Sequence, residues 1–134
     1  MNKQITVVVI ATRAILLADG LEALVKAIPE IERVEIVRTL ENALQRVEEI
    51  KPRILLLDLV LAGKHPEPCL DRISTLSPET LRVLLVDDVL DMKWQPQFAE
   101  AVLIKGALPS AVATILNDLL VLKEKEHEEA QGAE

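Results

Sequence analysis

The sequence predicts an α/β domain built on a doubly wound, five-stranded parallel sheet. The chain has 134 residues, a length for which one hydrophobic core serves the whole chain. Half of the residues are hydrophobic but only 1% are aromatic, so the predicted core is aliphatic. Short aliphatic runs alternate with segments of helical spacing along the chain. This alternation favours parallel strands joined by right-handed helical crossovers.

Four short, almost wholly aliphatic runs predict strands that are buried on both faces of the sheet. A fifth, weaker run alternates apolar and charged residues, as an edge strand does. The four buried strands are predicted at residues 7–10, 54–59, 83–86 and 102–104, and the edge strand at residues 34–37. The common arrangement for five such strands is the flavodoxin-like order 2-1-3-4-5, with helices on both faces.

Helical spacing between the strands predicts helices at residues 15–27, 40–50 and 69–76. Thr39 is expected to cap the second of them, and Pro29 and Pro52 end the first and second. A last helix is expected to begin at Pro109, and its apolar stripe should pack on the sheet. That stripe consists of Val112, Ala113, Ile115, Leu116, Leu119 and Leu120.

The chain divides into one domain, residues 1–122, and an acidic tail, residues 123–134. We expect the tail either to extend the last helix or to fray, as a solvated terminus or the start of a linker.

Charge and composition exclude several classes of function. The net charge is −7 and no cluster of Lys and Arg is present, which argues against direct binding of nucleic acid or of an anionic membrane surface. No apolar run is long enough to cross a bilayer, and Met1 is followed by a strand-like segment and not by a signal peptide, so we expect a cytoplasmic protein. The single cysteine, Cys69, excludes an internal disulfide.

Polar residues follow the buried strands at the points where the strands end. Because parallel strands share one carboxyl edge, these side chains are candidates for a common site. An acid at the end of an apolar strand must be paired, hydrogen-bonded or functional, because a lone buried carboxylate is costly. Backbone N–H groups and a strand-end lysine are one structural way to satisfy it. The candidates are Thr12, Arg13, Asp58, Asp87, Asp88 and Lys105.

Two segments carry a resemblance to a known family. KPRILLLDLVLAGK contains Asp58, and VLIKGALPSAV contains Lys105. Over residues 5–120 the chain resembles the receiver domain of bacterial two-component response regulators. In that family an acidic pair after the first strand binds Mg²⁺, and an aspartate ending the third strand accepts a phosphoryl group. A Ser or Thr after the fourth strand and a Lys after the fifth contact the acyl phosphate. The resemblance implies that Asp58 is the phosphoacceptor, or its vestige, and that Lys105 is this lysine.

The sequence departs from the family at the other site positions. Ala11, Thr12 and Arg13 occupy the stretch of the acidic pair, and Asp87 stands in place of the Ser or Thr. If Arg13 also faces the pocket, Asp58, Asp87, Lys105 and Arg13 sum to zero charge. This composition weakens Mg²⁺ binding and suggests Arg13 as a substitute for the cation. We therefore expect no obligatory cofactor.

Asp87 and Asp88 resemble an acidic pair themselves, but they follow Asp58 in the chain. We therefore assign them to the fourth strand end. The alternative is that they cap the next segment or face solvent.

The stretch between the fourth and fifth strands is shorter than in the family. The helix there is expected to be short or irregular, with altered partner contacts. Trp94 in this stretch either anchors an interface or packs over the sheet edge.

The resulting hypothesis is a pseudo-receiver, which is not an enzyme and signals through contacts with a histidine kinase or an output domain. Pairing as a homodimer is a further expectation from the family. One alternative is a working receiver that is phosphorylated at Asp58 through a non-standard Mg²⁺ site with Asp87 or Asp88. A second alternative is a small flavodoxin-like protein that binds an anion or a metabolite.

Overall fold

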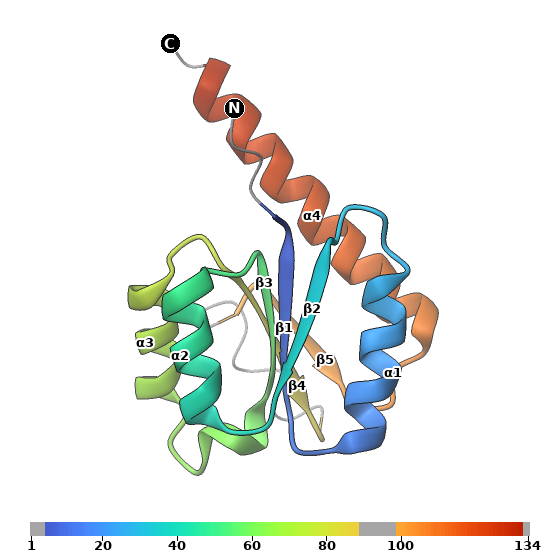
Figure 1. Cartoon of the computed structure of the whole chain (residues 1–134), viewed down its shortest axis with the longest axis vertical. Coiled ribbons are helices and arrows are strands. Elements are labelled where there is room, and N and C mark those ends of the chain that lie inside the picture. The colour runs from blue at the N-terminus through green and yellow to red at the C-terminus, as the bar shows by residue number, and fades with distance from the viewer. Residues whose placement is uncertain (1–4, 89–98, 133–134) are drawn as a thin grey trace.

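The computed structural model describes residues 5–88 and 99–132, the last eleven of these by their backbone alone (Figure 1). The chain forms β1 (Val7–Ala11), α1 (Ile15–Lys26), β2 (Arg33–Val37), α2 (Leu40–Ile50), β3 (Ile54–Asp58), a short 3₁₀ helix η1 (Leu59–Ala62), α3 (Glu67–Leu76), β4 (Leu81–Val86), β5 (Ala101–Ile104) and α4 (Pro109–Gly132).

The strands form one parallel sheet in the order β2-β1-β3-β4-β5, which confirms the predicted topology. The chain winds in opposite directions from the β1–β3 pair, so the switch point lies between these two strands. Ala11 at the end of β1 pairs with Leu57 of β3, and Asp58 pairs with Leu85 of β4. Thr12 and Asp58 therefore leave the sheet at neighbouring positions on its carboxyl edge.

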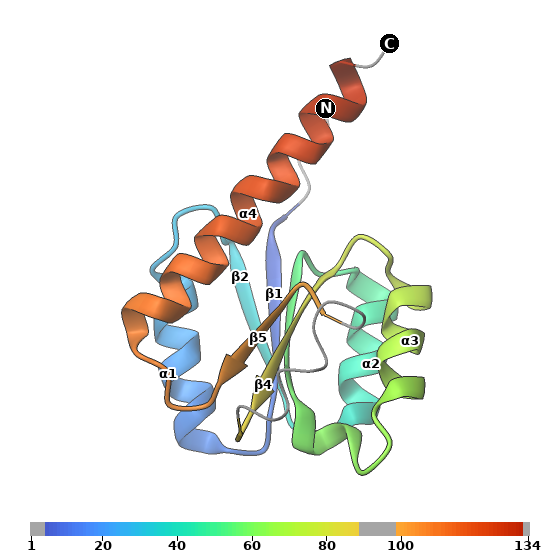
Figure 2. The ribbon, with the colours of Figure 1, turned by 180° about the vertical axis from the view of Figure 1, so that it is seen from behind.

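Helices cover both faces of the sheet (Figures 1 and 2). Successive side chains of a strand point to opposite faces, and the core divides accordingly into two clusters. Val8 and Ile10 of β1 face the cluster that includes α1 and α4, whereas Val7 and Val9 face the cluster that includes α2 and α3. Burial on both faces explains why these strands are continuous aliphatic runs.

Several strand boundaries differ from the predicted ones for identifiable reasons. β3 ends at Asp58, one residue early, because the Asp58 side chain accepts a hydrogen bond from the Val60 N–H and so begins η1. β4 begins at Leu81 and not at residue 83, since the charged Arg82 continues the strand with Glu100 as its partner. β1 and β5 each gain an alanine, α1 ends at Lys26, and α3 begins at Glu67.

α4 begins at Pro109, as predicted, and its apolar stripe packs against the sheet. The Arg53 guanidinium donates a hydrogen bond to the Leu120 carbonyl across 3.1 Å, which fastens α4 to the segment before β3. The helix then continues to Gly132 and projects away from the sheet (Figure 1). Of the two alternatives for the tail, extension of the last helix is therefore the one observed. Within the described part of the chain, no helix is long and apolar enough to cross a membrane.

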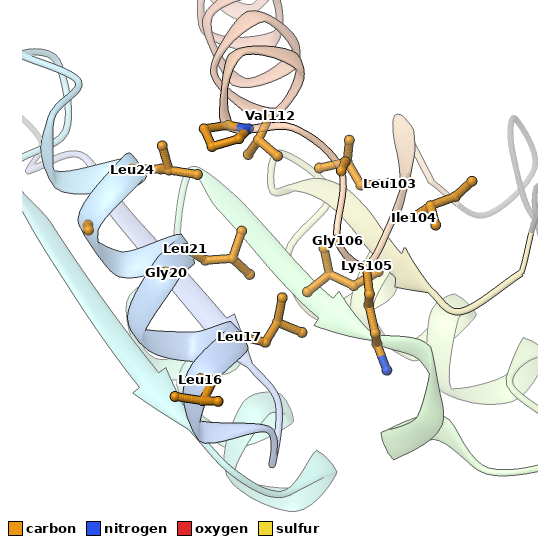
Figure 3. Close-up of a pocket in the computed structure, with 14 residues that line it drawn as sticks. Leu16, Leu17, Gly20, Leu21, Leu24, Leu103, Ile104, Lys105, Gly106 and Val112 are labelled. Atoms are coloured by element: carbon orange, nitrogen blue, oxygen red, sulfur yellow. The ribbon is translucent and has the colours of Figure 1, made fainter.

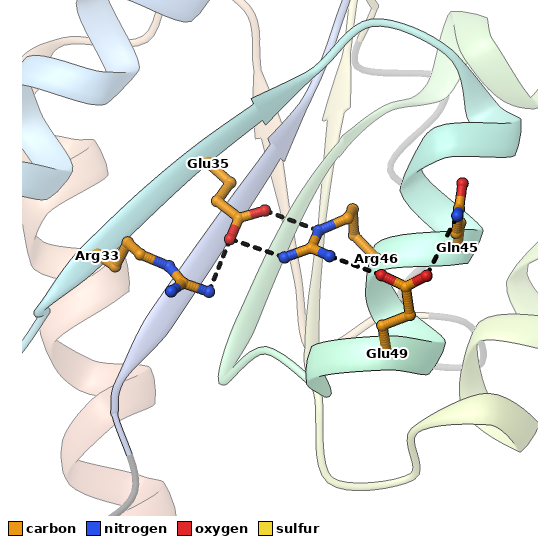
Figure 4. Close-up of polar contacts among 5 residues, drawn as sticks. All are labelled: Arg33, Glu35, Gln45, Arg46 and Glu49. Atoms are coloured by element: carbon orange, nitrogen blue, oxygen red, sulfur yellow. Dashed lines mark hydrogen bonds and ion pairs between the residues drawn. The ribbon is translucent and has the colours of Figure 1, made fainter.

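An ionic network joins the edge strand β2 to α2 (Figure 4). The Glu35 carboxylate lies 2.8 Å from both the Arg33 and the Arg46 guanidinium groups, and Arg46 also contacts Glu49 across 2.6 Å. The hydrogen bond from Arg46 lowers the pKa of Glu35 and, with the charges of both arginines, outweighs the opposing effect of burial. Charged side chains on an edge strand also discourage further strand pairing.

The N-cap of α2 provides a test of local stability. The Thr39 hydroxyl accepts a hydrogen bond from the Asn42 N–H across 3.0 Å. We expect Thr39→Ala to lower the free energy of unfolding by about 1 kcal/mol, measured by urea denaturation, because one N–H at the helix start loses its partner. Thr114→Ala, inside α4, is the control and should not destabilise the fold, because alanine is the better helix former. Equal losses in both variants would contradict the capping role.

Candidate functional site

The carboxyl edge of the sheet brings four of the predicted site residues together. Thr12 follows β1, Asp58 ends β3, Asp87 follows β4 and Lys105 follows β5. Each side chain is positioned by a strand that the aliphatic core holds in register, so the site is built on rigid elements.

Asp58 is the centre of the site, and both of its carboxylate oxygens have partners. The Thr12 hydroxyl donates to Oδ2 across 2.7 Å. The Lys105 ammonium lies 2.7 Å from Oδ1, and the Val60 N–H donates to the same oxygen across 3.1 Å. Asp58 is only 4% exposed and Thr12 only 1%. The charge is therefore removed from water and compensated by protein groups.

Lys105 links the buried part of the site to its surface. Its ammonium lies 3.3 Å from Asp87, whose side chain is 66% exposed. Burial lowers the pKa of Lys105, but hydrogen bonds and charge attraction, first from Asp58 and then from Asp87, outweigh it and raise the pKa overall. The lysine is therefore held in its charged form between two carboxylates.

Arg13 and Asp88 are both exposed. Arg13 forms no ion pair or hydrogen bond with another residue in the described ranges, so it lies outside this cluster. The Lys105 ammonium lies beside Asp58, as expected, whereas Arg13, suggested from the sequence as a substitute for Mg²⁺, is exposed and is not paired with Asp58. The clustered side chains of Asp58, Asp87 and Lys105 sum to a charge of −1, and not to the zero expected with Arg13 included. Trp94 and the stretch 89–98 lie outside the described residues.

The donor set at this edge does not fit a Mg²⁺ ion. Mg²⁺ takes carboxylate oxygens in near-octahedral geometry. Here Oδ2 of Asp58 accepts from Thr12 and Oδ1 is held by Lys105 and Val60, so three of the roughly four lone pairs of this carboxylate are already in use. Within the described ranges, no group of three or more His, Cys, Asp or Glu side chains is placed to hold a metal ion.

Sequence reasoning placed Thr12 in the pocket but missed what it does. The Thr12 hydroxyl donates to Asp58 and also accepts from the Ala14 N–H across 3.2 Å. One hydroxyl therefore joins the buried carboxylate to the start of α1. The available signal was a threonine between a buried strand and a helix, because such hydroxyls commonly bond to a nearby backbone N–H.

Several of the similar solved structures are receiver domains. No family model matches the sequence, and no curated protein matches it. A CheY-like response regulator receiver domain protein from Methanospirillum hungatei JF-1 is 18% identical with a TM-score of 0.78, over 91% of this chain and 98% of that one. The signal receiver domain of a putative LuxO repressor protein from Vibrio parahaemolyticus is 25% identical with a TM-score of 0.79, over 92% and 95%.

A third similar structure is the signal receiver domain of the putative response regulator NarL from Mycobacterium tuberculosis. It is 17% identical with a TM-score of 0.72, over 87% of this chain and 96% of that one. The chain therefore has the receiver-domain fold of two-component response regulators. The Asp58–Lys105 pair lies at the carboxyl edge of its sheet, where α/β proteins of this kind bind ligands.

The hydroxyl of Thr12 is predicted to stabilise the fold through Asp58. We expect Thr12→Val to lower the free energy of unfolding by about 2 kcal/mol, because a buried carboxylate loses a hydrogen bond. Thr12→Ser keeps the hydroxyl, so its free energy of unfolding should fall clearly less than that of Thr12→Val. Urea denaturation of both variants gives the comparison, and equal stability of the valine variant and the wild type would contradict this role.

The raised pKa of Lys105 predicts a pH dependence with a defined sign. A lysine whose pKa is higher in the folded state stabilises the fold fully below its ordinary pKa of 10.5, and this contribution is lost as pH rises through the folded value. The stability difference between wild type and Lys105→Met should thus be constant near neutral pH and shrink above 10.5. Lys64→Met, at an exposed loop lysine, is the control. If the stability difference between wild type and Lys105→Met grew at alkaline pH, the predicted direction of the pH dependence would be wrong.

Proposed function

We propose that this protein is a pseudo-receiver, a module with the receiver fold that signals by protein contacts without obligatory phosphorylation of Asp58. One observation carries the proposal. Both oxygens of Asp58 are occupied by protein donors, and the donor after β1 is the neutral Thr12 hydroxyl where the receiver family has an acid.

Phosphoryl transfer to an aspartate requires a free carboxylate oxygen and neutralisation of the charge on the phosphoryl group. Lone pairs of the Asp58 carboxylate are engaged by the ion pair with Lys105 and by the hydrogen bond from Thr12. These contacts leave about one lone pair of the carboxylate for attack on a phosphoryl donor, inside a buried site. The absence of an acidic pair after β1 also weakens the recruitment of a metal to assist the reaction.

The partners that we propose are signalling proteins of a two-component pathway, such as a histidine kinase or an output domain, in the cytoplasm. The likeness to receiver domains supports this class of partner. In this role the protein is not an enzyme and needs no resident metal.

A working receiver is the second candidate, because the Asp58–Lys105 pair is present and Asp87 supplies another carboxylate near the lysine. Anion binding has less support. The Lys105 ammonium is already paired with two carboxylates, which would repel an incoming anion.

Intact-protein mass spectrometry after incubation with Mg²⁺ and acetyl phosphate tests the proposal. We expect no added phosphoryl group on the wild type under conditions that phosphorylate an ordinary receiver domain. Thr12→Asp returns a carboxylate beside Asp58, and a gain of phosphoryl uptake in this variant would identify Thr12 as the blocking residue. Asp58→Asn is the control that assigns any uptake to Asp58.

Phosphoryl uptake by the wild type that disappears in Asp58→Asn would overturn the pseudo-receiver and establish the working receiver. Uptake that persists in Asp58→Asn would reflect modification elsewhere and leave Asp58 without a phosphoacceptor role.

A further inference from the structure

A cavity of about 350 Å³ lies between α1 and the start of α4, next to β5 (Figure 3). Leu17 and Leu21 point from α1 across this space toward β5 and the loop that leads into α4. Lys105 contributes its aliphatic stem, while its amine points away from the leucines. The lining is therefore almost wholly apolar, and no charged group is directed into it.

The outer face of α1 beside this cavity is also apolar. Leu16 is 87% exposed, and Gly20 and Ala23 of α1 and Ala27, the C-cap residue that follows it, are exposed too. Their spacing of four, three and four residues places them on one face. Leu108, in the loop on the other side of the cavity, is 71% exposed. Exposed apolar side chains that gather on one face in this way define a surface on which a partner could pack.

The charge around this face is balanced. Between residues 13 and 27, Arg13 and Lys26 offset Asp19 and Glu22. The α1 segment thus has no net charge, although the whole chain carries −7. A second copy of the chain can therefore approach this face without the repulsion that the remaining surface would impose.

We propose that α1 packs antiparallel against α1 of a second copy, about a two-fold axis that passes between residues 21 and 22. In this register Gly20 faces Ala23 of the second copy, so the two helices can approach closely. Leu16 faces Ala27 of the second copy and covers the end of the apolar face. An interface about a two-fold axis uses the same patch on both chains, and this patch supplies both the large and the small side chains.

The exposed charges of α1 fit the same register. Asp19 faces position 24 of the second copy, which lies two residues, or about 3 Å along the helix axis, from Lys26. Lys26 already lies 3.3 Å from Glu22 of its own helix and is 61% exposed. Its ammonium can therefore bridge Glu22 and Asp19 of the second copy. This charge complementarity favours a second copy over an unrelated apolar occupant. The proposed pairing does not depend on the phosphorylation state of Asp58.

Analytical ultracentrifugation over a range of concentrations tests the pairing. We expect the wild type to form dimers and Leu16→Glu to weaken them at least tenfold, because a carboxylate replaces an exposed leucine at the interface. Ile5→Glu is the matched control, since Ile5 is 59% exposed and lies before β1, outside α1. A wild type that stays monomeric, or a dimer that Leu16→Glu leaves unchanged, overturns the proposal. A monomer that retains an apolar small molecule in native mass spectrometry also overturns it.

Disulfide crosslinking tests the antiparallel register. Leu16→Cys and Ala27→Cys, each made in a Cys69→Ser chain, should crosslink when mixed, because the two positions face each other. Identical positions lie eleven residues, about 16 Å, apart along the axis, too far for a disulfide. Each variant alone should therefore remain largely uncrosslinked. Glu48→Cys on α2 is the control partner, and equal yields with it would overturn the register.

Discussion

The buried carboxylate of Asp58 is the constraint on which the carboxyl edge of the sheet depends. A charge at 4% exposure is stable only with close partners, and these come from the ends of β1 and β5 and from the first turn after β3. The three strand ends are thereby held in one arrangement. Removing either side-chain partner leaves a charge inside the protein, which costs more than the contact contributes.

The sheet itself could be predicted closely because its signal is local and repeated. Burial on both faces makes each central strand an aliphatic run, and the number of strands then favours one order. The boundaries that were missed lie where side chains make specific bonds. Arg82 is charged yet continues β4 because Glu100 pairs with it, and Asp58 stops β3 because its carboxylate caps the next turn. Neither effect has a periodic pattern in the sequence.

The site could be predicted only in part, for a related reason. Strand ends identify Asp58 and Lys105 as neighbours, since parallel strands in register share one edge. The direction of a side chain just beyond a strand is set by the loop and not by the pleat. Thr12 and Arg13 are adjacent in sequence, yet Thr12 turns into the core and Arg13 into solvent. Charge counting on the sequence therefore included an arginine that does not take part.

The Thr12 hydroxyl connects the site to the proposed pairing surface. It donates to Asp58 and accepts from the Ala14 N–H, and α1 begins at the next residue, Ile15. The Asp58 carboxylate is compensated by groups of its own chain. The same hydroxyl thus contacts both the buried carboxylate and the residue that precedes α1. A displacement of the start of α1 would act first on the bond between Thr12 and Ala14, and through that hydroxyl on the buried carboxylate.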